Sequence, residues 1–237
     1  MYKGEQIVIQ TPKKVLIFAA HQDDETIGCG GTIKKWSDAG SEIHVCFMTD
    51  GGTGIDPEHD PYTRHNIKTI RMKEASLAAK VLGIHRIHEF RVKCQTLRNG
   101  QLIFHKCISL IRKVKPDLVV THDKVCKHRD HKATSEIVVE ACWKASERLS
   151  SELGEVHAVD AVWSFEILDP HPNPDFVVDI TDTYGYKMKA MAIYFSQHGI
   201  LSGIMDYIDG LAKVRGHSVG VKYGEAFTRL GNIPVKL

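Results

Sequence analysis

Hydrophobic and polar positions along the chain fall into blocks whose lengths and spacings match β-strands and α-helices. Residues 15–20 form an unbroken apolar run of strand length, and between such runs apolar side chains recur every three or four residues, as in amphipathic helices. The pattern predicts strands over residues 15–20, 42–49, 84–92, 117–121, 158–168 and 176–180. It predicts a first helix that follows the glycines at 28–31 and ends at Gly40, and further helices over residues 66–82, 102–115, 130–153, 187–196 and 205–214.

This alternation of strands and helices predicts one α/β domain over residues 1–237. We expect a single Rossmann-like, mostly parallel sheet with helices on both faces, because parallel strands joined by helices are covered on both sides. The final stretch of about 40 residues is expected to be an extension that completes the pocket or an oligomer contact. Residues 55–65, with two prolines and several charges, are expected to form a surface loop.

Composition narrows the class of protein. The net charge is only +2, from 31 basic and 29 acidic residues, so the chain lacks the electrostatic footprint of a nucleic-acid-binding protein. No apolar run approaches the roughly 20 residues of a membrane span, and residues 7–9 are too short an apolar core for a signal peptide. Six cysteines without a C-x-x-C pair indicate reduced, buried thiols in a cytoplasmic protein, and fourteen histidines favour metal chemistry.

A first polar cluster follows the strand at residues 15–20. His21, Asp23 and Asp24 lie at its carboxyl end, where open α/β sheets bind their ligands. The glycines at 28–31 suggest a dinucleotide-binding turn, but the carboxylates already occupy the helix N-terminus and would repel a pyrophosphate. A metal cation fits the same position, with His21 and Asp24 as ligands and Asp23 free for proton transfer. Alternatively, the carboxylates only cap the helix.

A second polar cluster follows the strand at residues 117–121. His128, Asp130 and His131 lie in the loop and first helical turn after that strand, so both clusters are expected at one rim of the sheet. Two imidazoles and one carboxylate, from His21, Asp24 and His131, match the ligand pattern of hydrolytic zinc sites, with water completing the sphere. Cys126 is the alternative third ligand, and it would give a softer, more structural site.

The two clusters carry a resemblance to a known family. The stretch from Ala20 to Glu25 (AHQDDE) and the stretch from His128 to His131 (HRDH) are similar to the two signature motifs of the PIG-L/LmbE-like N-deacetylases, which act on N-acetylglucosamine derivatives. The chain also resembles bacillithiol-pathway members of that family near its end. The supporting landmarks are Thr49–Gly52, Arg71–Glu74, Val81–Gly83, Phe176–Ile180, Ser196–Gln197, Arg215–Gly216 and Tyr223–Phe227.

Three positions depart from the family pattern. Gln22 and Arg129 each stand where the family has proline, so both loops lose a fixed φ angle but keep their metal-binding and proton-carrying side chains. Residues 93–97 (KCQTL) contain no aspartate before Leu97, whereas many members carry one there that helps to hold the sugar. This last departure bears on the identity of the sugar rather than on the hydrolysis.

The resemblance implies a mechanism and a set of roles. One Zn²⁺ per chain would be held by His21, Asp24 and His131, with Asp23 as the general base. His128, oriented by Asp130, would stabilise the oxyanion together with the metal. The resemblance also implies a small-molecule amino-sugar substrate and a homo-oligomer, a trimer or hexamer.

Three questions stay open at this point. Arg71 is expected either to contact the sugar hydroxyls or an anionic group of the substrate, or to form a structural ion pair with Glu74. The whole site could belong to a catalytically inactive zinc-binding module that recognises glycans or a partner protein, as the lost prolines and aspartate suggest. Iron, cobalt and nickel suit the same ligands.

Overall fold

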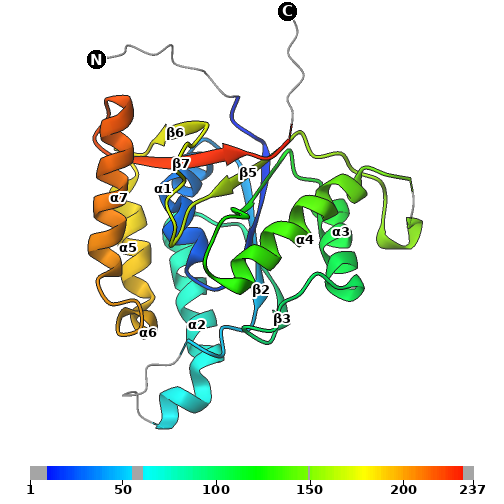
Figure 1. The fold of residues 1–237 in the computed structure, drawn as a ribbon, viewed down its shortest axis with the longest axis horizontal. Coiled ribbons are helices and arrows are strands. Elements are labelled where there is room, and N and C mark those ends of the chain that lie inside the picture. Colours follow the sequence, from blue (N-terminus) through cyan, green and yellow to red (C-terminus); the bar gives the residue numbers. More distant parts are fainter. Residues whose placement is uncertain (1–9, 55–60, 149, 232–237) are drawn as a thin grey trace, which may run out of the picture.

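A seven-stranded sheet forms the centre of the protein (Figure 1) in a computed structural model that describes residues 10–54, 61–148 and 150–231. The strand order is β3-β2-β1-β4-β5-β7-β6, and among these strands β7 alone runs antiparallel to the other six. The strands are β1 (Lys14–Ala19), β2 (Glu42–Thr49), β3 (Arg86–Val92), β4 (Leu118–His122), β5 (Ala161–Phe165), β6 (Phe176–Asp179) and β7 (Gly224–Arg229). The predicted α/β fold with a mostly parallel sheet is therefore confirmed.

Helices cover both faces of the sheet, as predicted (Figure 1). On one face, Val15, Ile17 and Ala19 pack with residues of α1, α2, α5 and α7, while on the other face Leu16 and Phe18 pack with α3 and α4. The helices are α1 (Asp24–Asp38), α2 (Pro61–Leu82), α3 (Gln101–Val114), α4 (Arg129–Ala145), α5 (Tyr184–Ile193), α6 (Phe195–His198) and α7 (Ile204–Val219), with a 3-10 turn at Ser151–Leu153. None of them, within the described ranges, is long and apolar enough to cross a bilayer.

Helix α1 differs from its prediction, because it begins at Asp24 rather than after the glycines. The helix is kinked at Cys29, whose φ is −147°, so its second half starts a new turn at Gly30. The glycines serve packing rather than phosphate binding: a Cβ on Gly28 would lie 2.4 Å from Phe165, and one on Gly31 would lie 2.8 Å from Ile180.

The bounds of α4 and α2 also differ from their prediction. Helix α4 ends at Ala145, well before the predicted residue 153, because the buried Arg112 guanidinium takes up the helix's last carbonyls, including those of Lys144 and Ala145. Helix α2 begins at Pro61, so the predicted loop at 55–65 belongs in part to this helix, and residues 55–60 lie outside the described residues.

The C-terminal strand anchors the kinked helix α1. Glu225 on β7 accepts hydrogen bonds from the backbone N–H groups of Gly31 and Thr32, at 2.9 and 2.7 Å, and from the Thr32 hydroxyl at 2.6 Å. The buried Lys187 ammonium forms an ion pair with Glu225 at 2.6 Å and donates to the Ile27 carbonyl at 2.7 Å. A carboxylate therefore caps the second half of the helix that carries the first polar cluster.

Candidate metal centre

Strands β1 and β4 are adjacent and parallel, so the loops that follow them meet at one rim of the sheet. His21 and Asp24 come from the end of β1 and the first turn of α1, and His131 comes from the first turn of α4. All three residues are at least nine-tenths buried. The structure thus brings together two segments that are about a hundred residues apart in the sequence.

The three predicted ligands converge. His21 Nδ1 lies 3.2 Å from Asp24 Oδ2 and 3.3 Å from His131 Nε2, which in turn lies 3.4 Å from Asp24 Oδ1. Ligand atoms held about 2.1 Å from a tetrahedral Zn²⁺ are about 3.4 Å apart, so the spacing fits one shared ion. Two ring nitrogens and a carboxylate facing one point also require a cation or extra protons between them.

The charge balance of this site favours a cation. Burial alone would lower the pKa of His21, but the Asp24 and Asp130 carboxylates outweigh it and raise that pKa well above its usual range. Burial would likewise lower the pKa of His131, yet Asp24 raises it to about 9. Although burial opposes it, the surrounding histidines hold the pKa of Asp24 well below its ordinary value. The same negative field is available to a metal ion.

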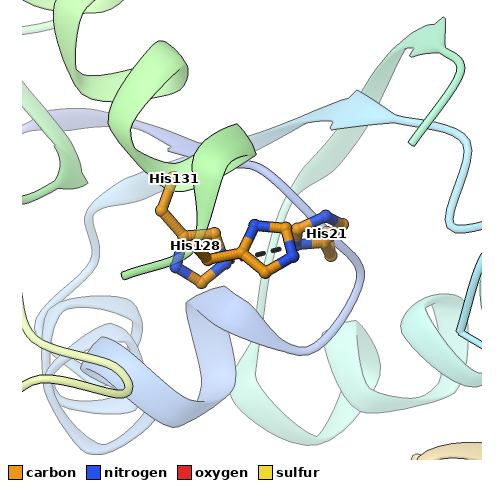
Figure 2. Close-up of side chains that lie close together, drawn as sticks. All are labelled: His21, His128 and His131. Atoms are coloured by element: carbon orange, nitrogen blue, oxygen red, sulfur yellow. Dashed lines mark hydrogen bonds between the residues drawn. The ribbon is translucent and has the colours of Figure 1, made fainter. Parts of the chain in front are cut away.

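Two further histidines border the three ligands. The ring of His128 lies 4.7 Å from that of His21 and 4.6 Å from that of His131, so these three form an alternative ligand group (Figure 2). His122, at the end of β4, is the residue that sequence reasoning missed. Its Nε2 lies 3.3 Å from Asp24 Oδ2, and with Asp24 and His131 it forms another possible ligand group. The sequence signal that could have identified His122 is its position directly after the predicted strand at residues 117–121.

His122 and His128 are both neutral rings. Burial lowers the pKa of His122 to about 3, and its Nε2 accepts a hydrogen bond from the Ala20 N–H at 2.9 Å, which occupies that lone pair. Burial, with His21 and His131 nearby, lowers the pKa of His128 to about 4. The backbone N–H of Asp130 donates to His128 Nδ1 at 3.2 Å, so the neutral ring carries its proton on Nε2.

Asp23 is held in a strained conformation beside the ligands. Its φ is +132°, a region that residues with a side chain rarely adopt and that often marks functional sites. Arg71 donates to Asp23 Oδ2 at 3.1 Å, to the Gln22 carbonyl at 2.7 Å and to the Gly51 carbonyl at 3.3 Å. Burial raises the pKa of Asp23 to about 7, with the Asp24 charge adding to the rise and Arg71 opposing it.

Arg71 is 3% exposed, and its guanidinium faces Asp23. The predicted alternative of an ion pair with Glu74 is wrong, since Glu74 instead accepts hydrogen bonds from the Ser196 backbone N–H and hydroxyl at 2.8 and 2.6 Å. The predicted contact between Arg71 and substrate stays a prediction.

The predicted contact between Asp130 and His128 is made by the backbone of Asp130, whose N–H donates to His128 Nδ1 at 3.2 Å, and not by its carboxylate. Asp130 Oδ2 instead lies 3.2 Å from His21 Nε2 and accepts a hydrogen bond from the Gln95 N–H at 2.7 Å. Only the backbone N–H of Asp130 reaches His128. A carboxylate on the far nitrogen of a metal-binding histidine fixes the ring's orientation and increases its basicity, so Asp130 supports His21.

Cysteines lie on the outer sides of two candidate ligands. Cys126 Sγ lies 3.3 Å from His131 Nδ1, the nitrogen that points away from Asp24, so the alternative of Cys126 as third ligand lacks support. Cys94 lies beside His21 and Asp130. All six cysteines are buried and unpaired, in agreement with the prediction of reduced thiols.

Comparison with known proteins gives one family match and several relatives. Residues 16–142 match the model of the family PIG-L, described as GlcNAc-PI de-N-acetylase. A diacetylchitobiose deacetylase from Thermococcus kodakarensis is 28% identical, with 90% of this chain and 81% of the relative covered. A probable N-acetyl-alpha-D-glucosaminyl L-malate deacetylase 2 from Bacillus cereus is 28% identical, with 78% and 84% covered.

Solved structures share the fold. The N,N'-diacetylchitobiose deacetylase from Pyrococcus horikoshii, complexed with an inhibitor, superposes with a TM-score of 0.84 at 29% identity, covering 92% of this chain and 84% of that one. The matched family segment runs from β1 into α4, so it includes every predicted ligand and the second polar cluster.

Proposed function

This chain belongs to the PIG-L family, described as GlcNAc-PI de-N-acetylase, and we propose that it is a zinc-dependent hydrolase that removes the acetyl group from an N-acetylated amino sugar or its conjugate. The observation that carries the proposal is the convergence of His21, Asp24 and His131 with the Asp23 carboxylate beside them. The deacetylase names of the relatives support the reaction, and their sugar substrates support the substrate class.

His21, Asp24 and His131 would hold the ion. A divalent metal bound there supplies a Lewis acid, which polarises the acetyl carbonyl and lowers the pKa of water. Two imidazoles and a carboxylate suit Zn²⁺, although the same donors accept other first-row metals. Asp130 keeps the His21 ring in place through Nε2.

Asp23 is the proposed general base. It would take a proton from the attacking water and later deliver it to the amide nitrogen, which leaves as an amine only when protonated. A pKa of about 7 suits both steps, because the group can accept and release a proton near neutral pH. Arg71 fixes the carboxylate, and so acts on the reaction through Asp23.

His128 is the proposed oxyanion donor. Its neutral ring carries a proton on Nε2, opposite to the nitrogen held by the Asp130 N–H. That proton can be donated to the carbonyl oxygen as negative charge develops there. Removing one such donor typically costs about 3–4 kcal/mol of transition-state stabilisation.

Acetate release from a panel of N-acetylated amino sugars, with metal analysis of the same preparation, tests the proposal. We expect release from at least one N-acetylglucosamine-type substrate and about one equivalent of metal per chain. Metal binding without acetate release from any substrate would instead favour the inactive recognition module, which glycan-binding measurements on the same protein would then identify.

A further inference from the structure

The two ring nitrogens of His21 face two different groups of ligand atoms. Nδ1 faces Asp24 and His131, the proposed catalytic ligands, at 3.2 and 3.3 Å. Nε2 faces the opposite way, toward Asp130 Oδ2 at 3.2 Å. On that side, one ligand atom from each of His21, Cys94 and Asp130 lies within 4.8 Å of the others. Because Asp130 approaches from the Nε2 side, we take Nε2 as the His21 atom of this group.

We propose that His21 Nε2, the Cys94 sulfur and the Asp130 carboxylate form a second, inhibitory site for a thiophilic divalent ion such as Cd²⁺ or excess Zn²⁺. Thiolate, imidazole and carboxylate are all ligands of Zn²⁺ in proteins, and a sulfur ligand selects soft ions against Mg²⁺ and Ca²⁺. This site differs from the proposed catalytic centre, whose three ligands contain no sulfur.

The geometry favours binding because the group is already assembled and partly unsatisfied. Asp130 is fully buried, and within the described part of the chain its Oδ1 atom has no hydrogen-bond partner. Cys94 is 1% exposed, and its sulfur lies 3.1 Å from the Thr49 hydroxyl. The backbone N–H of Cys94 donates to Asp50 Oδ1 at 3.2 Å, which fixes the loop that carries the thiol. A cation would satisfy the buried carboxylate oxygen.

Inhibition follows from the shared imidazole. An ion at this site displaces the protons of His21 Nε2 and of the Cys94 thiol to solvent, because both atoms bind metal only through a free lone pair. It also places a second positive charge on the same ring that faces the catalytic ion. Coulombic repulsion between the two ions then weakens the binding of the catalytic ion to His21 Nδ1.

The experiment titrates the zinc-loaded protein with CdCl₂ while recording the ultraviolet charge-transfer absorbance of cadmium bound to thiolate, with bound metals counted after equilibrium dialysis. We expect the band to saturate with about one Cd²⁺ per chain, since only a site with sulfur produces it. For Cys94→Ser we expect the band to disappear and the affinity for Cd²⁺ to fall at least about tenfold. Where deacetylase activity is measured, its loss should follow the band.

Cys126→Ser is the matched control, because Cys126 is a second buried thiol that contacts another proposed ligand, His131, from its outer side. It should keep the band. An undiminished band in Cys94→Ser, or a band lost only in Cys126→Ser, overturns the proposal. The zinc content and melting temperature of each variant report folding, and Cys94→Ala replaces Cys94→Ser if the latter does not fold. The band does not depend on catalysis, so a protein without deacetylase activity leaves this test intact.

Discussion

Two buried ion pairs hold the bent helix α1, one at its start and one at its kink, and they differ in how completely their carboxylates are satisfied. At the helix start, the Asp23 carboxylate receives a hydrogen bond only from Arg71 among the described residues, at 3.1 Å. At the kink, the Glu225 carboxylate receives four, from Gly31, from Lys187 and from the backbone and hydroxyl of Thr32. Both pairs are almost fully buried.

This difference separates a reactive carboxylate from a structural one. Four donors satisfy the Glu225 carboxylate and hold it between α1 and α5, so its role is structural. Asp23 has one donor, a strained backbone and a raised pKa, so both of its protonation states are accessible near neutral pH. We expect loss of the first pair to affect turnover, and loss of the second to affect stability.

The largest effect is expected from Asp23→Ala. Removal of a general base typically slows turnover by a factor of about 10²–10⁴, while His21, Asp24 and His131 keep their donors. We therefore expect acetate release to fall by about 10³-fold with metal content unchanged. Steady-state kinetics and metal analysis of the same sample test this. Activity near that of the wild type would show that Asp23 is not the general base.

The next largest effect is expected from Glu225→Gln. It leaves the Lys187 ammonium buried without its partner, which typically costs about 3–5 kcal/mol in the free energy of unfolding. Urea denaturation measures the loss. Activity per folded molecule should change far less than in Asp23→Ala. The double variant Glu225→Gln/Lys187→Met removes the unpaired charge and should recover part of the loss. A stability unchanged within error would show that the anchor contributes little.

Arg71→Lys tests the role of the ion pair between Arg71 and Asp23. Lysine keeps the charge but loses the planar set of donors that reaches Asp23 and the Gln22 and Gly51 carbonyls. We expect kcat to fall about 10–100-fold with little change in KM, because the base loses its orientation. If Arg71 instead contacts the substrate, as the sequence predicts, the variant should show a higher KM at an unchanged kcat. The kcat and KM values therefore decide between the two roles.

Thr32→Val should have the smallest effect. It removes one neutral hydroxyl donor from Glu225 while the backbone N–H of the same residue is kept. A net loss of about 1 kcal/mol in the free energy of unfolding is typical of one hydrogen bond. Thermal and urea denaturation measure it, with turnover expected to be unchanged. A loss as large as that of Glu225→Gln would mean that the hydroxyl, rather than the ion pair, holds the helix.

The two central strands β1 and β2 are well predicted from sequence because they are buried and mostly apolar. Strand β2 has the predicted bounds, Glu42–Thr49, and β1 differs by one residue at each end. Strand β7 is missed. Its sequence, GEAFTR, is short and half polar, and its place between β5 and β6 depends on contacts with segments distant in the chain. The early end of α4 likewise depends on Arg112, a side chain from another helix.

The site is predicted in its composition but not in all its contacts. Each cluster directly follows a strand, and this order alone places His21, Asp24 and His131 at one rim. The contacts between individual atoms depend on the direction in which each side chain points. Asp130 lies beside His128 in sequence, yet helical geometry turns its carboxylate toward His21. Arg71 reaches Asp23 across a separation of 48 residues that no local pattern encodes.

The insertion of β7 between two earlier strands sets an order for biosynthesis. A nascent chain has made every proposed metal ligand by residue 131, yet α1 does not receive its Glu225 cap until β7, the last strand of the described residues, is translated. Domains fold as units once their sequence is complete, so the newly made protein is expected to gain activity only after this late strand has entered the sheet. Ribosome-stalled chains that end before Gly224 should therefore lack activity, although they contain all of the proposed catalytic residues.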